Sequence, residues 1–232
     1  MEIFSNSFST IFYNPFFVFR RELYSNIQRI GSTFTNTTLD FGCGTMPYKH
    51  LFTNTKQYIG LDIETSGNPY DRQPDIVYDG KVIPLENQTI DNVFCAEVLE
   101  HVFNPNDVLQ EINRILKPNG QLLLTCPFTI FEHEAPYDYA RYSSFGLTHL
   151  LKENGFEVVE FVKTGSYLST VLQLIAVYIY FVIAKIPVLK HILFIALITP
   201  LFLLSLLADA LPITIKRKDL YLNNVVLAKK IR

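Results

Sequence analysis

A strand and a glycine loop are encoded together in Thr38-Leu39-Asp40-Phe41-Gly42-Cys43-Gly44-Thr45-Met46-Pro47-Tyr48. The apolar residues Leu39 and Phe41 predict a short buried strand, and the two glycines predict a tight loop that a ligand can approach closely. Loops of this kind bind nucleotide-like ligands in open α/β sheets. The loop is not a Walker phosphate loop, because no Gly-Lys-Ser/Thr follows it. Pro47 also stands where the dinucleotide fingerprint has a third glycine.

Two further acidic residues follow at the ends of predicted strands. Asp62 ends the strand Gln57–Ile63, 22 residues after Asp40. A carboxylate about 20 residues beyond a first glycine turn is well placed to accept hydrogen bonds from ribose hydroxyls. Asp79 directly follows the next predicted strand, Ile76–Tyr78, and is itself followed by Gly80. The order of these acids predicts a nucleoside-binding edge in a parallel sheet.

The next stretch, Leu85–Val102, ends in Leu99-Glu100-His101-Val102. Together with the glycine loop and the strand-end acids, it resembles the class I S-adenosylmethionine-dependent methyltransferases, in the small-molecule branch with D-x-G-x-G and LEHV motifs. The resemblance covers Leu39 to Phe161. It implies a Rossmann-like, seven-stranded, mostly parallel sheet with helices on both faces. The last strand of such a sheet is antiparallel and lies between the fifth and sixth.

The resemblance also implies the cofactor, S-adenosyl-L-methionine, and the residues that hold it. Asp40 and the backbone of the glycine loop would hold the methionine part, and Asp62 would accept from the ribose hydroxyls. Asp79 and Gly80 would contact the adenine, with a simple turn acid as the alternative for Asp79. The full set of expected cofactor residues is Asp40, Gly42, Cys43, Gly44, Asp62, Ile63, Asp79, Gly80, Ala96 and Glu97.

The rest of the chain alternates helices and strands. Apolar spacing predicts a helix from Pro15 to Gly31 and another that begins at Asn104, with Pro105 at its first turn. Lys117–Gly120 is expected to end that second helix. The remaining expected elements are a fifth strand Gln121–Cys126, a helix capped by Ser143 or Ser144, a sixth strand Phe156–Val162 and a last strand Tyr221–Lys229.

The loop after the fifth strand contains His133-Glu134 and continues to Tyr142. It resembles an acceptor-side loop of the same family. His133 is the candidate general base for a hydroxyl acceptor, with Glu134 orienting it. The alternative is that Arg141 and Tyr142 only fasten the loop. His101 is interpreted as a structural residue.

Composition narrows the classes of partner. The chain has 232 residues and a formal charge of −2, which provides no basic field for nucleic acid. The three cysteines form no CxxC pair, so we expect reduced thiols in the cytosol and no metal site. Residues 1–24 lack a basic n-region, so no secretory signal is expected.

Two apolar runs, Leu168–Ala184 and Ile192–Ala208, predict a helical hairpin inserted before the last strand. Three interpretations stay open: a hairpin dipping into or across a bilayer, helices lying in the interface, and a dimerisation or core hairpin. The expected domains are an N-terminal arm and helix (1–36), a methyltransferase domain (37–166 and 219–232) and the hairpin insertion (167–218).

The sequence therefore predicts a membrane-associated methyltransferase with a lipid-linked or hydrophobic acceptor, such as a glycan or a quinone-like molecule. We expect it on the cytoplasmic side, peripheral or monotopic on the inner face of the membrane, with membrane contact through 168–208. One alternative is a non-catalytic cofactor-binding scaffold. Another is a soluble small-molecule O-methyltransferase that uses the hairpin to form a homodimer.

Overall fold

The computed structural model describes residues 7–63, 74–210 and 218–231. The predicted segments 1–36 and 167–218 therefore extend into residues 1–6 and 211–217, which lie outside the described part. The chain forms two compact units, which are described separately. One unit combines Ile27–Val162 with Asn224–Arg232, and the other combines Met1–Asn26 with Lys163–Asn223.

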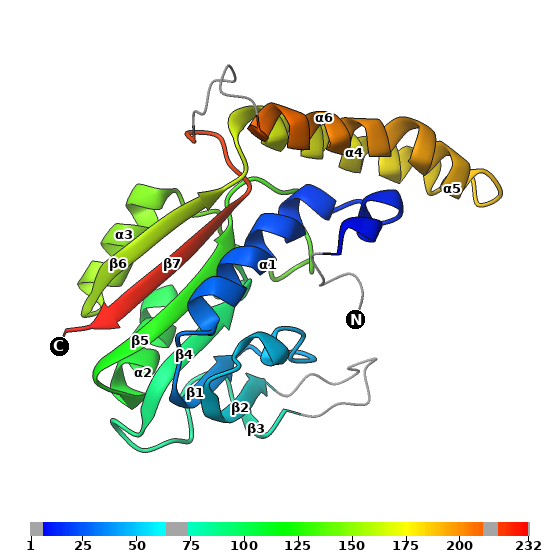
Figure 1. Cartoon of the computed structure of the whole chain (residues 1–232). Helices are drawn as coiled ribbons and strands as arrows, with labels where there is room; N and C mark the ends of the chain where they lie inside the picture. The colour runs from blue at the N-terminus through cyan, green and yellow to red at the C-terminus, as the bar shows by residue number, and fades with distance from the viewer. Residues whose placement is uncertain (1–6, 64–73, 211–217, 232) are drawn as a thin grey trace. The chain divides into compact units, whose positions relative to one another are not determined.

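A seven-stranded sheet with the strand order β3-β2-β1-β4-β5-β7-β6 is the framework (Figure 1). The strands β1 to β5 pair in parallel, and β7 runs against its neighbours β5 and β6. This confirms the predicted topology, including the antiparallel last strand. The bounds are β1 Asn36–Phe41, β2 Thr55–Ile63, β3 Ile76–Tyr78, β4 Ile90–Ala96, β5 Leu116–Pro127, β6 Phe156–Thr164 and β7 Asn223–Lys230.

Helices cover the sheet because its central strands are apolar on both faces. On one face, α2 (Pro105–Ile115) and α3 (Ser144–Glu153) bury Ile112 and Leu151 against β1, β4 and β5. On the other face, Phe94 of β4 packs on Phe52, with ring centroids 4.9 Å apart. Gly31, the last residue of α1 (Phe17–Gly31), lies against the same Phe52 ring. The sheet thus has a core on each side, as parallel sheets require.

The helix ends follow local chemistry. Ser143 caps α3 by accepting from the Gly146 amide at 3.2 Å, as its sequence predicts. At the end of α2 the structure differs from the expectation, because β5 already begins at Leu116. Pairing places Ile90 opposite Leu116 and Asn92 opposite Gln121, so Lys117–Gly120 forms a bulge within the strand. Asn119 takes the positive φ of 63° that this bulge requires.

The second unit contains the two apolar segments. They form α4 (Tyr167–Ile183) and a continuous helix, Lys190–Ala210, made of α5 (Lys190–Leu193), the π-helical turn η5 (Phe194–Ile198) and α6 (Thr199–Ala210). The helices α4 and α6 pack side by side (Figure 1). The hydroxyls of Ser166 and Ser169 both donate to the Asp209 carboxylate at 2.6 Å, which fastens the start of α4 to the end of α6.

Gln173, the only amide side chain in the first apolar run, has a structural role. Its Oε1 accepts from the amides of Val18 and Phe19, and its Nε2 donates to the Pro15 carbonyl at 2.7 Å. It therefore satisfies free amides in the first turn of α1, the role usually taken by a local N-cap. The short 3-10 turn η2 (Phe8–Phe12) also belongs to this unit, where the Ile11 carbonyl accepts from the Thr199 hydroxyl.

Candidate functional site

The predicted cofactor residues meet at one edge of the sheet. Phe41 lies between Leu61 of β2 and Cys95 of β4, and Ile63 pairs with Tyr78 of β3. Four neighbouring parallel strands therefore end together, and the candidate residues stand at or just beyond those ends. Ligands bind at this edge in open α/β sheets.

The loop after β1 is built on glycine for two different reasons. Gly42 has a φ of +69°, and a Cβ at this position would lie 2.4 Å from Val98 Cγ2. Gly44 also has a positive φ, +47°, but a Cβ there would meet no atom within 4 Å. The amides of Gly42 and Cys43 both donate to the Leu61 carbonyl. Gly42 thus permits close packing, whereas Gly44 leaves open space beside the strand ends.

Asp40 is buried beneath this loop. Its side chain accepts a hydrogen bond from the Tyr58 hydroxyl at 2.7 Å. Burial raises the pKa of the Asp40 carboxyl to about 7, and the Tyr58 hydrogen bond only partly offsets that effect. Asp62 raises the pKa of Asp40 a little further, and Lys49 lowers it. Asp40 is therefore a buried acid whose charge depends on pH near neutrality.

Asp62 connects the glycine loop to β2. Its Oδ2 accepts from the Gly44 amide and its Oδ1 accepts from the Ile63 amide, both at 2.8 Å. The carboxylate is only half-buried, so its remaining lone pairs are available to a ligand. Ile63, 46% exposed, adds an apolar surface beside them.

Asp79 and Gly80 follow β3 and form a tight turn. The Asp79 Oδ1 accepts from the amides of Lys81 and Val82, and these two bonds lower the pKa of the carboxyl. Gly80 has a φ of +79°. Oδ1 of Asp79 therefore acts as the acceptor of a simple turn, which was the alternative for this residue. Asp79 itself is exposed, so its Oδ2 can still reach a ligand.

Ala96 ends β4, and Glu97 directly follows it. Glu97 takes a φ of +56°, and its Oε1 accepts from the Thr125 hydroxyl at 2.8 Å. The neighbouring thiols are buried and free, and burial raises the pKa of Cys43 to about 12. Thiolate chemistry is therefore disfavoured at this edge.

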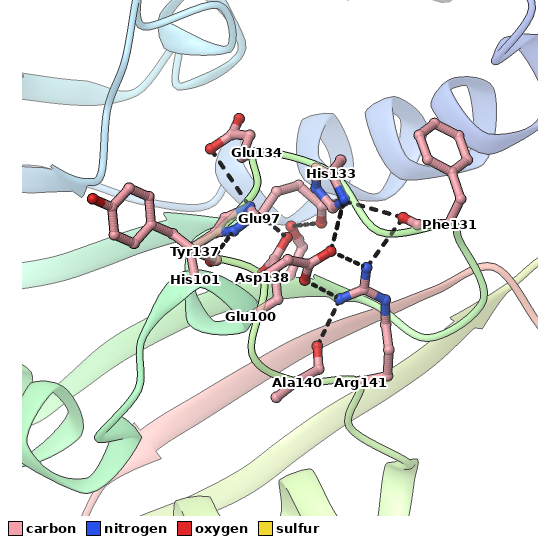
Figure 2. A network of polar contacts seen from close by, with 11 residues as sticks. Glu97, Glu100, His101, Phe131, His133, Glu134, Tyr137, Asp138, Ala140 and Arg141 are labelled. Atoms are coloured by element: carbon pink, nitrogen blue, oxygen red, sulfur yellow. Dashed lines mark hydrogen bonds and ion pairs between the residues drawn. The ribbon is translucent and has the colours of Figure 1, made fainter.

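The acceptor-side loop, His133–Tyr142, is held by a polar network (Figure 2). Arg141 donates to both Asp138 oxygens, at 2.5 and 2.6 Å, and to the carbonyls of Phe131 and Ala140. This arginine lowers the pKa of the Asp138 carboxyl well below its usual range. Arg141 thus fastens the loop, which was one of the two interpretations open from the sequence.

His133 points into that network. Its Nδ1 lies 3.3 Å from Asp138 Oδ2, and its own amide donates to the same oxygen. Glu134, the residue expected to orient His133, is exposed and lies 3.7 Å from His101 Nε2 instead (Figure 2). The group in contact with the candidate base is therefore Asp138.

Glu100 is the residue that sequence reasoning missed. Its side chain is fully buried at the start of the network, and neither carboxylate oxygen has a hydrogen-bond partner within the described part of the chain. Burial raises the pKa of Glu100 to about 9, and the neighbouring Glu97 adds to the shift. The sequence offered one signal for Glu100, its place beside His101 in the LEHV motif. Its burial could not be predicted, because it depends on a loop that is distant in the sequence.

The strand-end residues fit S-adenosyl-L-methionine. The cofactor presents ribose hydroxyls, an adenine amine and an amino-acid end. The edge offers two exposed or half-exposed carboxylates, at Asp62 and Asp79, and an open glycine position at Gly44. Asp62 would hold the ribose and Asp79 the adenine.

Comparisons with known proteins agree with this geometry. Residues 39–124 match the model of a family described as "Methyltransferase domain". A thiol S-methyltransferase, TMT1B of Rattus norvegicus, is 28% identical over 116 residues, which are 44% of this chain and 48% of that protein. An uncharacterised methyltransferase of Schizosaccharomyces pombe is 32% identical over 97 residues, 39% of this chain and 38% of that protein. The chain thus matches half or less of the length of these relatives.

Solved structures share the fold. A phosphoethanolamine N-methyltransferase of Haemonchus contortus, solved with S-adenosyl-L-methionine, has a TM-score of 0.58 and 16% identity, covering 97% of this chain and 56% of that one. A putative methyltransferase of Bacillus halodurans has a TM-score of 0.55 and 16% identity, covering 90% and 99%. Residues 39–124 therefore match a methyltransferase domain, with the fold of the class I S-adenosylmethionine-dependent methyltransferases, and S-adenosyl-L-methionine is the cofactor of this domain.

Proposed function

We propose that the chain is a membrane-associated methyltransferase that acts on a lipid-linked or hydrophobic acceptor, such as a lipid-borne glycan or a quinone-like molecule. The observation that carries the proposal is the exposed apolar surface of α4 and the helix Lys190–Ala210. In the same unit, Tyr178 is 71% exposed, Val188 is 87% exposed and Ile192 is 66% exposed. Large apolar surfaces of this kind mark contact with a membrane or a protein partner.

The length and composition of the helices support membrane contact. Within the described residues, Lys190–Ala210 is long and apolar enough to cross a membrane, and Tyr167–Ile183 is a shorter apolar helix. Only 33% of the most apolar part of Lys190–Ala210 is buried, which is low for a core helix of a soluble protein. Lys185 lies between the two helices, and Lys190 and His191 begin the second one, where they suit a headgroup region and not the hydrocarbon centre.

The methyl group arrives on the sulfonium of the cofactor, which is already a strong electrophile. The chain's own residues then have two tasks. The glycine loop and Asp62 hold the cofactor in place, because alignment of the reacting atoms supplies much of the acceleration. His133 removes a proton from a hydroxyl acceptor, and Asp138 keeps its ring oriented through Nδ1, which leaves Nε2 as the basic atom.

Liposome flotation tests the membrane part of the proposal. The test variant replaces the exposed apolar residues of the hairpin: Tyr178→Asp, Val188→Asp and Ile192→Asp. Each apolar side chain that enters the membrane contributes about 1.5–3 kcal/mol, so the triple variant should partition more weakly by roughly a thousandfold or more. The matched control carries three aspartates at exposed apolar positions of the sheet unit: Val82 (61%), Phe103 (76%) and Phe145 (86%).

Flotation of the wild type and the control, with loss in the hairpin variant, supports the proposal. If the hairpin variant floats as well as the wild type, the hairpin is not the membrane contact. If the wild type does not float and elutes as a dimer that the hairpin substitutions dissociate, the hairpin is an interface between copies, and a soluble acceptor is the better hypothesis.

A further inference from the structure

The buried carboxylate of Glu100 is an unusual feature of the acceptor-side network. Its two oxygens have no hydrogen-bond partner among the described residues. Burying a carboxyl group without such a partner costs on the order of several kcal/mol of folding free energy. Glu97 adds a second negative charge nearby. The one cationic side chain of the network, Arg141, is engaged by both oxygens of Asp138. A metal ion that takes the place of the Glu100 proton would give both unpaired oxygens a partner.

Two imidazoles stand beside this carboxylate. The His101 and His133 rings lie edge to face with centroids 4.9 Å apart, and donor atoms of Glu100, His101 and His133 all lie within 4.8 Å of one another. His101 Nε2 is 3.8 Å from Glu100 Oε1, too far for a hydrogen bond. Two ligands of one tetrahedral zinc ion lie about 3.3 Å apart, so only small side-chain adjustments are needed.

Both histidines are already oriented as metal ligands usually are. The Nδ1 of His101 lies 2.8 Å from the Tyr137 carbonyl, which only a protonated Nδ1 can satisfy, so Nε2 carries the free lone pair. The Nδ1 of His133 faces Asp138 Oδ2 at 3.3 Å, which likewise leaves Nε2 free. Metal-binding histidines commonly donate their other ring N–H to a carbonyl or a carboxylate in this way.

We propose that Glu100, His101 and His133 form a binding site for a divalent transition-metal ion, with Tyr137 and Asp138 orienting the two imidazoles (Figure 2). Two imidazoles and one carboxylate are a ligand set that suits Zn²⁺ and leaves an open coordination position. The side chains of His101 and His133 are 16% and 27% exposed, which provides a route for the ion. The exposed Glu134, 3.7 Å from His101 Nε2, is close enough to become a fourth ligand.

The site uses no cysteine, which explains why cysteine spacing gave no sign of a metal. One consequence rests on the proposed function: an ion here would lower the pKa of an acceptor hydroxyl or thiol bound at the open position. His133 would then serve the reaction as a ligand in place of a base. The binding site itself does not depend on which acceptor is used.

Calorimetric titration of the full chain with Zn²⁺ tests the proposal, after treatment with a chelator and removal of any histidine tag. The wild type should bind one ion per chain, and His101→Ala and His133→Ala should each weaken binding by about tenfold or more. Glu100→Gln keeps the shape of the side chain, removes its charge and should weaken binding as well. His149→Ala, an exposed histidine on α3, is the matched control and should bind like the wild type.

Titration of the wild type with Co²⁺ provides a readout that needs no variant, because tetrahedral coordination gives visible absorption bands. The proposal is overturned if the wild type binds neither ion, or if His149→Ala loses as much affinity as His101→Ala and His133→Ala. Neither measurement uses an acceptor, a membrane or activity. Failure here would therefore be distinct from failure of the flotation experiment.

Discussion

Replacing Asp40 by asparagine should remove a large pH dependence of stability. The Asp40 side chain is buried, and its pKa is raised from 3.8 to about 7 in the folded chain, chiefly by burial. Asparagine has nearly the same shape, and its Oδ1 can still accept from the Tyr58 hydroxyl. The substitution therefore removes the titration and keeps the contact.

The sign and size follow from linkage. Between about pH 4 and pH 7 the unfolded chain has lost the Asp40 proton and the folded chain keeps it, so the stability of the folded state falls as pH rises. A shift of about three pKa units corresponds to a loss of at most about 4 kcal/mol, which is complete above the folded pKa. The stability difference between Asp40→Asn and the wild type should thus grow by about 1.4 kcal/mol per pH unit across this window.

Urea unfolding at a series of pH values measures this difference. The chain has no tryptophan, so the far-ultraviolet circular dichroism signal is the suitable probe. Tyr58→Phe is a second perturbation of opposite kind. It removes the hydrogen bond that lowers the pKa of Asp40, so the pH-dependent loss should extend to higher pH. A stability difference between Asp40→Asn and the wild type that stays constant from pH 4 to pH 8 would show that Asp40 does not titrate near neutrality in the folded chain.

Three further perturbations follow from the same structure. In urea unfolding, Gly42→Ala should destabilise the chain by about 1–3 kcal/mol more than Gly44→Ala. Both glycines have a positive φ, but only Gly42 packs against Val98. Equal effects of the two substitutions would contradict the packing role of Gly42. Asp62→Ala should weaken binding of S-adenosyl-L-methionine by about 1–3 kcal/mol in calorimetry, and unchanged affinity would show that the ribose site lies elsewhere. Gln173→Leu should destabilise the hairpin unit by about 1–3 kcal/mol, because two amides of α1 and the Pro15 carbonyl lose their partner. Limited proteolysis should then cut α1 faster than in the wild type, and an unchanged rate would count against this role of Gln173.

The sequence was informative where function depends on local order along the chain. Asp40, Asp62 and Asp79 each follow a strand with a clear apolar pattern, and parallel strands bring their ends together without further information. Ser143 was also recognisable, because an N-cap interacts within three residues. The antiparallel position of β7 was predicted from the family resemblance.

Features that depend on irregular or distant contacts were not predictable in this way. The contact of His133 with Asp138 depends on the path of a loop that has no repeating pattern. Gln173 caps a helix that lies about 155 residues away in the sequence, so its role needed the folded chain. Glu100 was hidden for the same reason, because its burial is created by the loop around Tyr139 and Ala140, whose amides donate to its carbonyl.

Transfer of a labelled methyl group most directly tests the claim that the domain acts on a lipid-phase acceptor. The full chain is incubated with S-adenosyl-L-methionine labelled in the methyl group and a total lipid extract of the source cells, and the label is then partitioned between organic and aqueous phases. Label is expected in the organic phase with the wild type, and much less with Asp62→Ala at the same cofactor concentration. Tight cofactor binding by the wild type without any label in the organic phase would contradict the claim.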